Sequence, residues 1–194
     1  MKIVSGGQTG VDRAALDVAL KHGIECGGWC PAGRLDEVGR IPDRYPLREL
    51  AQGSFADRTL ENVKDSDGTL IIYFGDPSGG TKFTIECGKQ LQRPHLLIDA
   101  AKTSAEKGVS AIVDFVREHK IDILNVAGPR QSEWAGGYNY AAAALDKFLH
   151  SIRSTRLRGA TARQGSTSMS RTEKKITRSA APSPGRAARR NRRG

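Results

Sequence analysis

Two glycine-rich turns in this sequence combine the residue types that bind anions. Each follows a short apolar run, contains glycines and a hydroxyl side chain, and opens a segment with helical periodicity. Glycines let the backbone approach an anion closely, and a helix N-terminus adds unpaired N–H groups and the positive end of its dipole. We predict phosphate binding by Gly6, Gly7, Gln8, Thr9 and Gly10 in the first turn and by Ser78, Gly79, Gly80 and Thr81 in the second. The alternative for each is an ordinary strand-to-helix turn whose Ser or Thr only caps the helix.

A third turn, residues 125–134, contains an arginine that could neutralise such an anion. The guanidinium of Arg130 presents a planar fork of donors that matches a phosphate or another oxyanion. On sequence alone, a solvated surface arginine or a partner of Glu133 is an equally good interpretation.

Other familiar chemistries lack their residues. The first turn is neither a dinucleotide G-x-G-x-x-G nor a P-loop, because the Lys-Ser/Thr pair is missing. Cys26 and Cys30 have no second pair or nearby histidine to complete a zinc site, so no metal ligands are predicted. No G-x-S-x-G turn is present to expose a nucleophilic serine.

The elements that must position these turns alternate between strands and helices. Strands are predicted over 2–5, 24–29, 69–74, 95–99 and 121–127, and helices over 11–22, 58–66, 81–91, from Ser104 onward, and over 138–152. Residues 30–56 are predicted to form a long irregular excursion, which in a compact domain usually has a function. This alternation is typical of an α/β domain with a mainly parallel sheet flanked by helices, where ligands bind at the carboxyl ends of the strands.

The net charge of +10 comes entirely from the end of the chain. Residues 151–194 contain thirteen Lys and Arg but one acid, whereas the remainder carries a charge of −2. We therefore predict one domain over 1–152 and a disordered basic tail over 153–194, which could bind nucleic acid through its backbone without reading bases. The sequence contains no run of about 20 apolar residues, so no membrane span is predicted. Neither a signal peptide nor paired cysteines are evident, so we expect a cytoplasmic protein with reduced thiols.

Five blocks along residues 1–150 resemble the molybdenum carrier family, the molybdenum-cofactor carrier proteins. In order, they are SGGQTGVDRAALDVAL, GGWCPAGRLDEVGRIPDRYPL, RTLENVKDSDGTLIIY, GGTKFT and LNVAGPRQSEW. The resemblance implies a Rossmann-like fold, a homo-oligomer, and a bound molybdenum cofactor (molybdopterin), a pterin with a phosphate and a dithiolene-bound metal. It implies that the loop glycines, Thr9, Ser78, Thr81 and Arg130 surround this ligand. It also implies contacts to the pterin ring from the 30–46 excursion, with Trp29, just before it, and Tyr45 as the candidates.

The same superfamily includes phosphoribohydrolases, once called lysine decarboxylase-like proteins, and these give a sharper comparison. Arg58 and Glu86 fall near the catalytic Arg and Glu of those enzymes. However, Glu86 lies five residues after Thr81 instead of three, which turns it by about 200° around a helix. We therefore favour a carrier over an enzyme. Two alternatives remain: a nucleoside-monophosphate phosphoribohydrolase with Arg58 on the phosphate and Glu86 or Asp12 as acid/base, and a nucleotide-sensing module with a nucleic-acid-binding tail.

Overall fold

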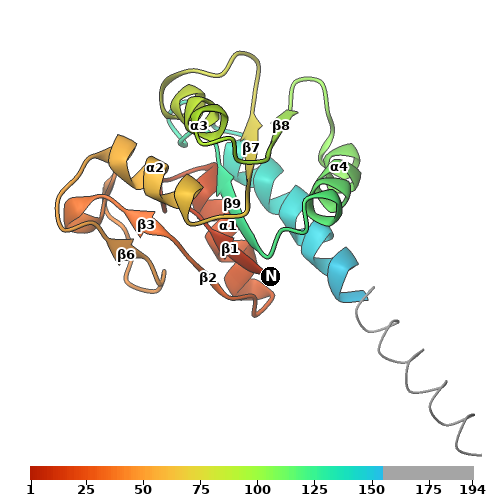
Figure 1. Ribbon diagram of the computed structural model, residues 1–194, viewed down its shortest axis with the longest axis horizontal. Coiled ribbons are helices and arrows are strands. Elements are labelled where there is room, and N and C mark those ends of the chain that lie inside the picture. The colour runs from red at the N-terminus through yellow and green to blue at the C-terminus, as the bar shows by residue number, and fades with distance from the viewer. Residues whose placement is uncertain (155–194) are drawn as a thin grey trace, which may run out of the picture. The chain divides into compact units, whose positions relative to one another are not determined.

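A five-stranded parallel sheet forms the centre of the fold (Figure 1). The structure is a computed structural model and describes residues 1–154. The strands lie in the order β2-β1-β9-β7-β8, and every neighbouring pair runs parallel. Their bounds are Lys2–Val4 (β1), Cys26–Gly27 (β2), Gly68–Tyr73 (β7), His95–Asp99 (β8) and Ile123–Ala127 (β9).

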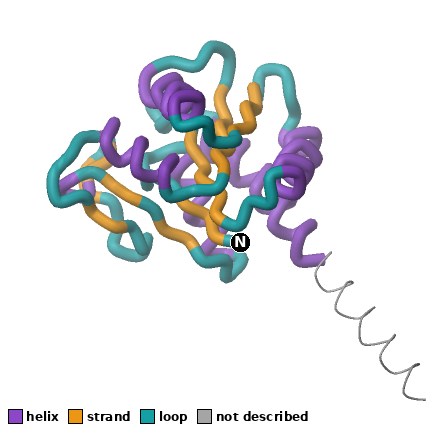
Figure 2. The backbone as a smooth tube through the Cα atoms, viewed as in Figure 1, coloured by secondary structure: helices purple, strands orange, loops and turns teal. Residues whose placement is uncertain are grey.

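Helices cover both faces of this sheet, as Figures 1 and 2 show. Connections between parallel strands are right-handed, so connections that run in opposite directions along the sheet lie on opposite faces. On one face, α2 (Phe55–Lys64) packs against α3 (Gly79–Gln90), which connects β7 to β8. The other face carries α1 (Val11–Lys21), α4 (Ala105–Glu118) and a helix that begins at residue 137. This arrangement confirms the predicted α/β, Rossmann-like fold.

The adjacent strands β7 and β9 mark the place where the direction of winding changes. The chain leaves β7 through α3 on one face, whereas the helix after β9 packs beside α1 on the other, where Tyr138 donates a hydrogen bond to Asp17 (3.0 Å). In open parallel sheets, the loops that diverge at such a point leave a crevice at the carboxyl ends of the strands. The topology therefore places a ligand site between the loops after β7 and β9.

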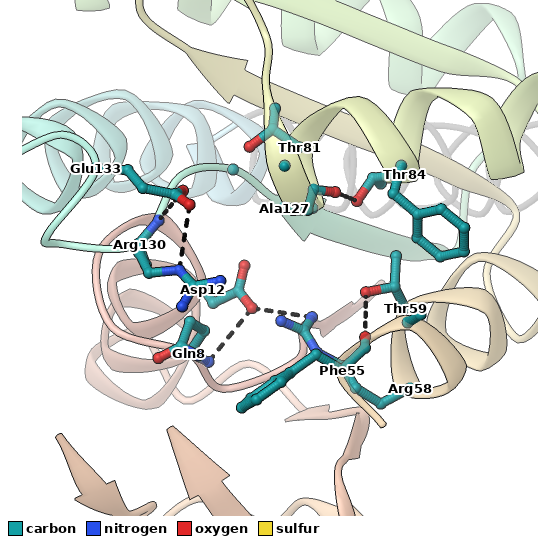
Figure 3. Close-up of a pocket in the computed structure, with 15 residues that line it drawn as sticks. Gln8, Asp12, Phe55, Arg58, Thr59, Thr81, Thr84, Ala127, Arg130 and Glu133 are labelled. Carbon is teal, nitrogen blue, oxygen red and sulfur yellow. Dashed lines mark hydrogen bonds and ion pairs between the residues drawn. The ribbon is translucent and has the colours of Figure 1, made fainter. Parts of the chain in front are cut away.

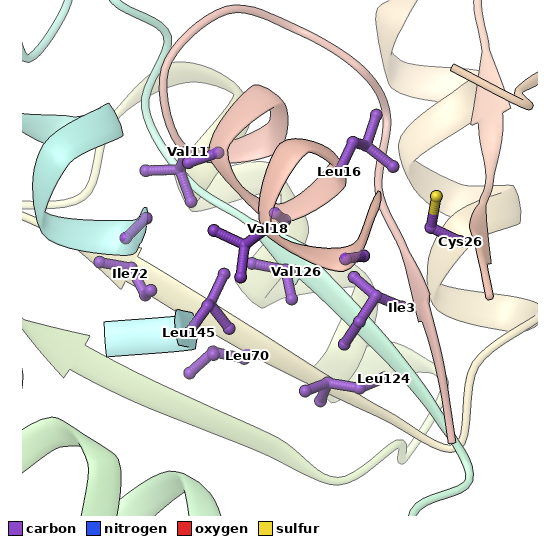
Figure 4. Packing of buried hydrophobic residues seen from close by; sticks show 14 of the residues in the cluster. Ile3, Val11, Leu16, Val18, Cys26, Leu70, Ile72, Leu124, Val126 and Leu145 are labelled. Carbon is purple, nitrogen blue, oxygen red and sulfur yellow. The ribbon is translucent and has the colours of Figure 1, made fainter. Parts of the chain in front are cut away.

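The apolar core lies between the sheet and the helices on the face that carries α1 (Figure 4). Leu70, Ile71 and Ile72 of β7 are all fully buried, as expected of a strand that is covered on both faces. Helix α1 contributes Val11, Leu16 and Val18, and the helix after β9 contributes Leu145. This core fixes the positions of β1, β7 and β9, from which the candidate site is built.

Two segments differ from the local predictions. Helix α2 begins at Phe55, three residues before the predicted start, because Ser54 and Asp57 form a reciprocal capping box. The excursion is more ordered than predicted. Strand β3 (Trp29–Cys30) pairs with β6 (Arg48–Glu49), and between them the chain forms the 3-10 turn Ala32–Arg34 and the hairpin of β4 (Leu35–Asp36) and β5 (Gly39–Arg40). The predicted strand 24–29 is accordingly divided between β2 of the main sheet and β3 of a separate pair.

Residues Met1–Ile152 form one compact unit. Apart from its first two residues, the tail predicted over 153–194 lies outside the described residues. In the described part of the chain, no helix is long and apolar enough to cross a membrane.

Candidate functional site

A cavity of about 240 Å³ lies at the carboxyl ends of the strands, between the loops that follow β7 and β9 (Figure 3). Its walls come from four segments that are distant in sequence: the loop after β1 and the start of α1, the start of α2, the start of α3, and the loop after β9. This position is the one that the change of winding direction predicts.

The N-terminus of α3 opens into this cavity. Gly79, Gly80 and Thr81 line it, and the side chain of the N-cap residue Ser78 makes no capping hydrogen bond. The first amides of a helix have no partner within it and lie at the positive end of its dipole. The hydroxyl of Thr81 is buried and has no partner within the described residues. An anion in the cavity would supply the acceptor that these donors lack.

At the N-terminus of α1, by contrast, the first helical amide and a loop amide before it already have partners within the protein. The amide of Val11 donates to the carbonyl of Pro129 (3.3 Å), and the amide of Gln8 donates to the carboxylate of Asp12 (3.3 Å). The loop after β9 packs so tightly here that a Cβ on Gly10 would lie 2.6 Å from the Pro129 oxygen. Of the two turns predicted to bind phosphate, the one before α3 therefore presents its helix terminus to this cavity.

The other glycines of the first turn allow close packing inside the protein. A Cβ on Gly6 would lie 1.7 Å from a nitrogen of the Arg58 guanidinium, and one on Gly7 would lie 2.4 Å from Leu47. Thr9 does not line the cavity; its hydroxyl donates to Glu37 and accepts from the amide of Gln131 (3.0 Å).

Gln8 does line the cavity. Its side-chain oxygen accepts from the amides of Thr9 (3.0 Å) and Glu37 (2.9 Å). Its side-chain nitrogen is buried without a partner among the described residues, so it is a further donor available to a ligand.

Arg58 and Asp12 form a buried ion pair at the base of the cavity (Figure 3). The guanidinium Nη1 lies 3.2 Å from Oδ2 of Asp12, and the two side chains are 13% and 2% exposed. Burial raises the pKa of Asp12, and the neighbouring Arg58 charge opposes that effect. The Nε of Arg58 has no partner within the described residues, so this arginine retains a donor beyond its ion pair.

Arg130 lines the opposite wall but already has an acidic partner. Its Nε lies 3.3 Å from Glu133, whose other oxygen accepts from the Arg130 amide at the same distance. Arg130 therefore faces the cavity while it is paired with Glu133, and its contact with an anion stays a prediction.

Several residues singled out in the sequence lie elsewhere. Ser78 is exposed and does not line the cavity; Glu86 is exposed on α3 and also does not line it, so Arg58 and Glu86 are not brought together there. Tyr45 is buried between Arg13 and Arg44, and the guanidinium carbon of each arginine lies 4.8 Å from the centroid of the Tyr45 ring.

Trp29 is also remote from the cavity. It lies under Arg48 and donates to Asp65 (2.8 Å). Neither Trp29 nor Tyr45 lines this cavity, and both rings hold the excursion in place, so their contact with a ligand ring stays a prediction.

Sequence reasoning missed the aromatic residues of the cavity, Phe55 on α2 and Phe83 on α3. The capping box of Ser54 and Asp57 was the available signal, since it fixes the helix start that brings Phe55 to the cavity. No local signal marks Phe83, whose position depends on how α3 packs against α2.

Two comparisons with known proteins identify the family and support the fold. The family model described as the circularly permutated YpsA SLOG family matches residues 3–149. The crystal structure of "Putative molybdenum carrier protein" from Syntrophus aciditrophicus SB is 46% identical, with a TM-score of 0.75 over 76% of this chain and 94% of that one. No functionally curated protein matches. The molybdenum carrier resemblance of the sequence is thus confirmed, and the chain belongs to the circularly permutated YpsA SLOG family.

Proposed function

We propose that this protein holds the molybdenum cofactor in the cavity between β7 and β9, with the cofactor's phosphate at the N-terminus of α3. The observation that carries the proposal is the open α3 terminus, where Thr81 adds a buried hydroxyl without a partner among the described residues. The similarity to a protein named as a molybdenum carrier supports the choice of ligand.

The donors around the cavity suit a phosphate ester. Helix amides, the Thr81 hydroxyl, the Gln8 amide and two arginines converge from four segments of the chain. Each arginine already faces a carboxylate, Arg58 with Asp12 and Arg130 with Glu133, so the empty cavity has little uncompensated positive charge. An incoming phosphate would share these arginines with the carboxylates, which favours reversible binding over permanent capture.

A carrier role requires binding and release without a change in the ligand. When bound, the cofactor would supply redox chemistry through its metal to a recipient enzyme, and the residues of this chain would only bind and orient it. The exposed position of Glu86 is consistent with that role, because the carboxylate that resembles the hydrolase acid does not reach the cavity.

Replacement of Gly80 by Asp tests the anion site. A Cβ at Gly80 would meet no atom within 4 Å, so Gly80→Asp introduces a carboxylate at the α3 terminus without a clash at its Cβ. A carboxylate there is favourable for the helix by about 0.3–1 kcal/mol, so the variant should fold at least as well as the wild type. We expect at least a tenfold loss of bound cofactor, measured as molybdenum by mass spectrometry and as pterin by fluorescence after oxidation.

The matched control is Gly80→Ala, which adds a Cβ without charge. All three proteins would be purified in parallel from a host that makes the cofactor. Gly80→Ala should retain molybdenum and pterin in equal amounts. Equal retention by Gly80→Asp would remove the α3 terminus from the site, and a wild-type protein without either component would contradict the carrier function.

A second candidate function is cleavage of nucleoside monophosphates. The observation in its favour is Asp12, a buried carboxylate with a raised pKa that lines the cavity beside Arg58. The test is incubation with a panel of nucleotides, with chromatography to detect the free base and ribose 5-phosphate. No product from any nucleotide would eliminate this candidate.

A further inference from the structure

The cavity lining includes an aromatic side chain, Phe55, on the same helix as the donor Arg58. Phe55 is the first residue of α2, and the Ser54–Asp57 capping box fixes its position. Its side chain lines the cavity yet remains 42% exposed, and no ring-to-ring contact involves it within the described residues. Phe74, another exposed aromatic, stacks on Trp134 with 5.7 Å between ring centroids. The Phe55 ring therefore has an apolar face that the protein itself does not cover with another ring.

The wall between the α3 terminus and Phe55 offers few donors. Thr59 and Thr84 both line the cavity, but their hydroxyls donate to backbone carbonyls one helical turn earlier, those of Phe55 (2.9 Å) and Gly80 (2.8 Å). Phe83 of α3 lines the same region. A ligand that extends from the α3 terminus toward Phe55 therefore meets two phenylalanine side chains and two hydroxyls that already have acceptors, with Gln8 and Arg58 as the remaining donors.

The size of the cavity indicates where a ring would lie. Pockets that enclose a whole small-molecule ligand have volumes of about 300–1,000 Å³. At about 240 Å³, this cavity accommodates a phosphate and its linker, so an attached ring would extend to the partly exposed side chain of Phe55.

We infer that Phe55 is a stacking platform for the planar ring of the phosphorylated ligand and so favours that ligand over a bare oxyanion. This inference rests on the proposed function for the anion end. A fused heterocycle has a π-face that stacks on an aromatic ring, whereas molybdate, phosphate or a sugar phosphate uses only the donors around α3.

Two probes with the same phosphate test the inference: guanosine 5′-monophosphate and ribose 5-phosphate. Their affinities for the full chain would be measured by calorimetry at 0.2 M salt, after dialysis, with Gly80→Asp as the background for binding by the basic tail. We expect the nucleotide to bind wild type at least tenfold more tightly than the sugar phosphate. Phe55→Ala should weaken nucleotide binding by about tenfold and leave ribose 5-phosphate unchanged, and Phe55→Trp should restore nucleotide binding.

The matched control is Leu97→Ala, since Leu97 is 41% exposed on the edge strand β8 and does not line the cavity. Its affinities should equal those of wild type. Equal binding of both probes, or unchanged nucleotide binding by Phe55→Ala, would overturn the stacking role while leaving the anion site intact. If neither probe binds above the Gly80→Asp background, the anion site fails and the stacking role fails with it. Tight binding of molybdate alone would also overturn the inference.

Discussion

At the scale of single residues, the buried carboxylate of Asp12 makes the clearest prediction. Its raised pKa means that the folded protein holds the proton more tightly than the unfolded chain does. Wild-type stability therefore falls as the pH rises from the ordinary carboxyl range of about 4 through the raised pKa. Asp12→Asn keeps an acceptor for the Gln8 amide and removes this cost, so it should unfold at higher urea than wild type at pH 7. The advantage should disappear at pH 4.

Asp146 is a suitable comparison, because its shift has the opposite sign. Lys21 and His22 lower the pKa of this exposed carboxyl through hydrogen bonds. Asp146 therefore stabilises the fold above the ordinary carboxyl pKa and loses that effect as the pH falls through its lowered value. Asp146→Asn should be slightly less stable than wild type at pH 7.

A destabilised Asp12→Asn at pH 7 would show that the charge pair with Arg58 outweighs the cost of burial.

At the scale of elements, the β4–β5 hairpin clamps two of the site loops together. The carboxylate of Glu37, at the hairpin tip, accepts from the Thr9 hydroxyl in the first turn and from the amide (3.2 Å) and hydroxyl of Ser132 in the third. Burial disfavours the charged form, but these hydrogen bonds outweigh it and lower the pKa of Glu37.

Glu37→Ala should therefore release the loop after β9. We expect a loss of about 1–2 kcal/mol in unfolding free energy at pH 7 and at least tenfold faster hydrogen exchange at the Ser132 amide. The difference from wild type should shrink as the pH falls through the lowered pKa of Glu37. Val38→Ala is the control, because Val38 is the neighbouring tip residue and is 81% exposed. Unchanged exchange at Ser132 in Glu37→Ala would show that the clamp does not hold this loop.

The same scale shows where sequence reasoning succeeds and where it stops. The strand His95–Asp99 is predicted to the residue, because a short apolar run between Pro94 and a turn has one simple interpretation. The excursion is not predicted, since β3 and β6 pair across residues 31–47 and neither has a periodic pattern of its own. The α3 terminus is predicted from its glycines and Thr81. The partner of the first α1 amide is Pro129, more than 100 residues away, and no local sequence pattern predicts that contact.

At the scale of the whole molecule, the sheet order identifies a second chain order that should give the same fold. If the chain began at β7, and β9 were joined to β1, the strands would follow one another as β7, β8, β9, β1 and β2. Numbered in that new chain order, the same sheet has the 2-1-3-4-5 arrangement of flavodoxin-like sheets. The helix from residue 137 would then become an ordinary crossover between β9 and β1, since it already packs on the correct face beside α1.

A permuted chain of residues 54–152, a flexible linker of about eight residues, and residues 1–53 tests this idea. The new ends lie in the exposed turn before α2, outside the core and directly before the N-cap residue Ser54. We expect the permuted chain to unfold within about 1 kcal/mol of residues 1–152 in the original order, because the packed elements are the same and only one short loop is exchanged for another. Urea unfolding followed by circular dichroism measures the difference. A permuted chain that fails to fold, beside a stable 1–152 control, would show that the contiguous path from β2 through the excursion into α2 is required for the fold, and not only the arrangement of strands.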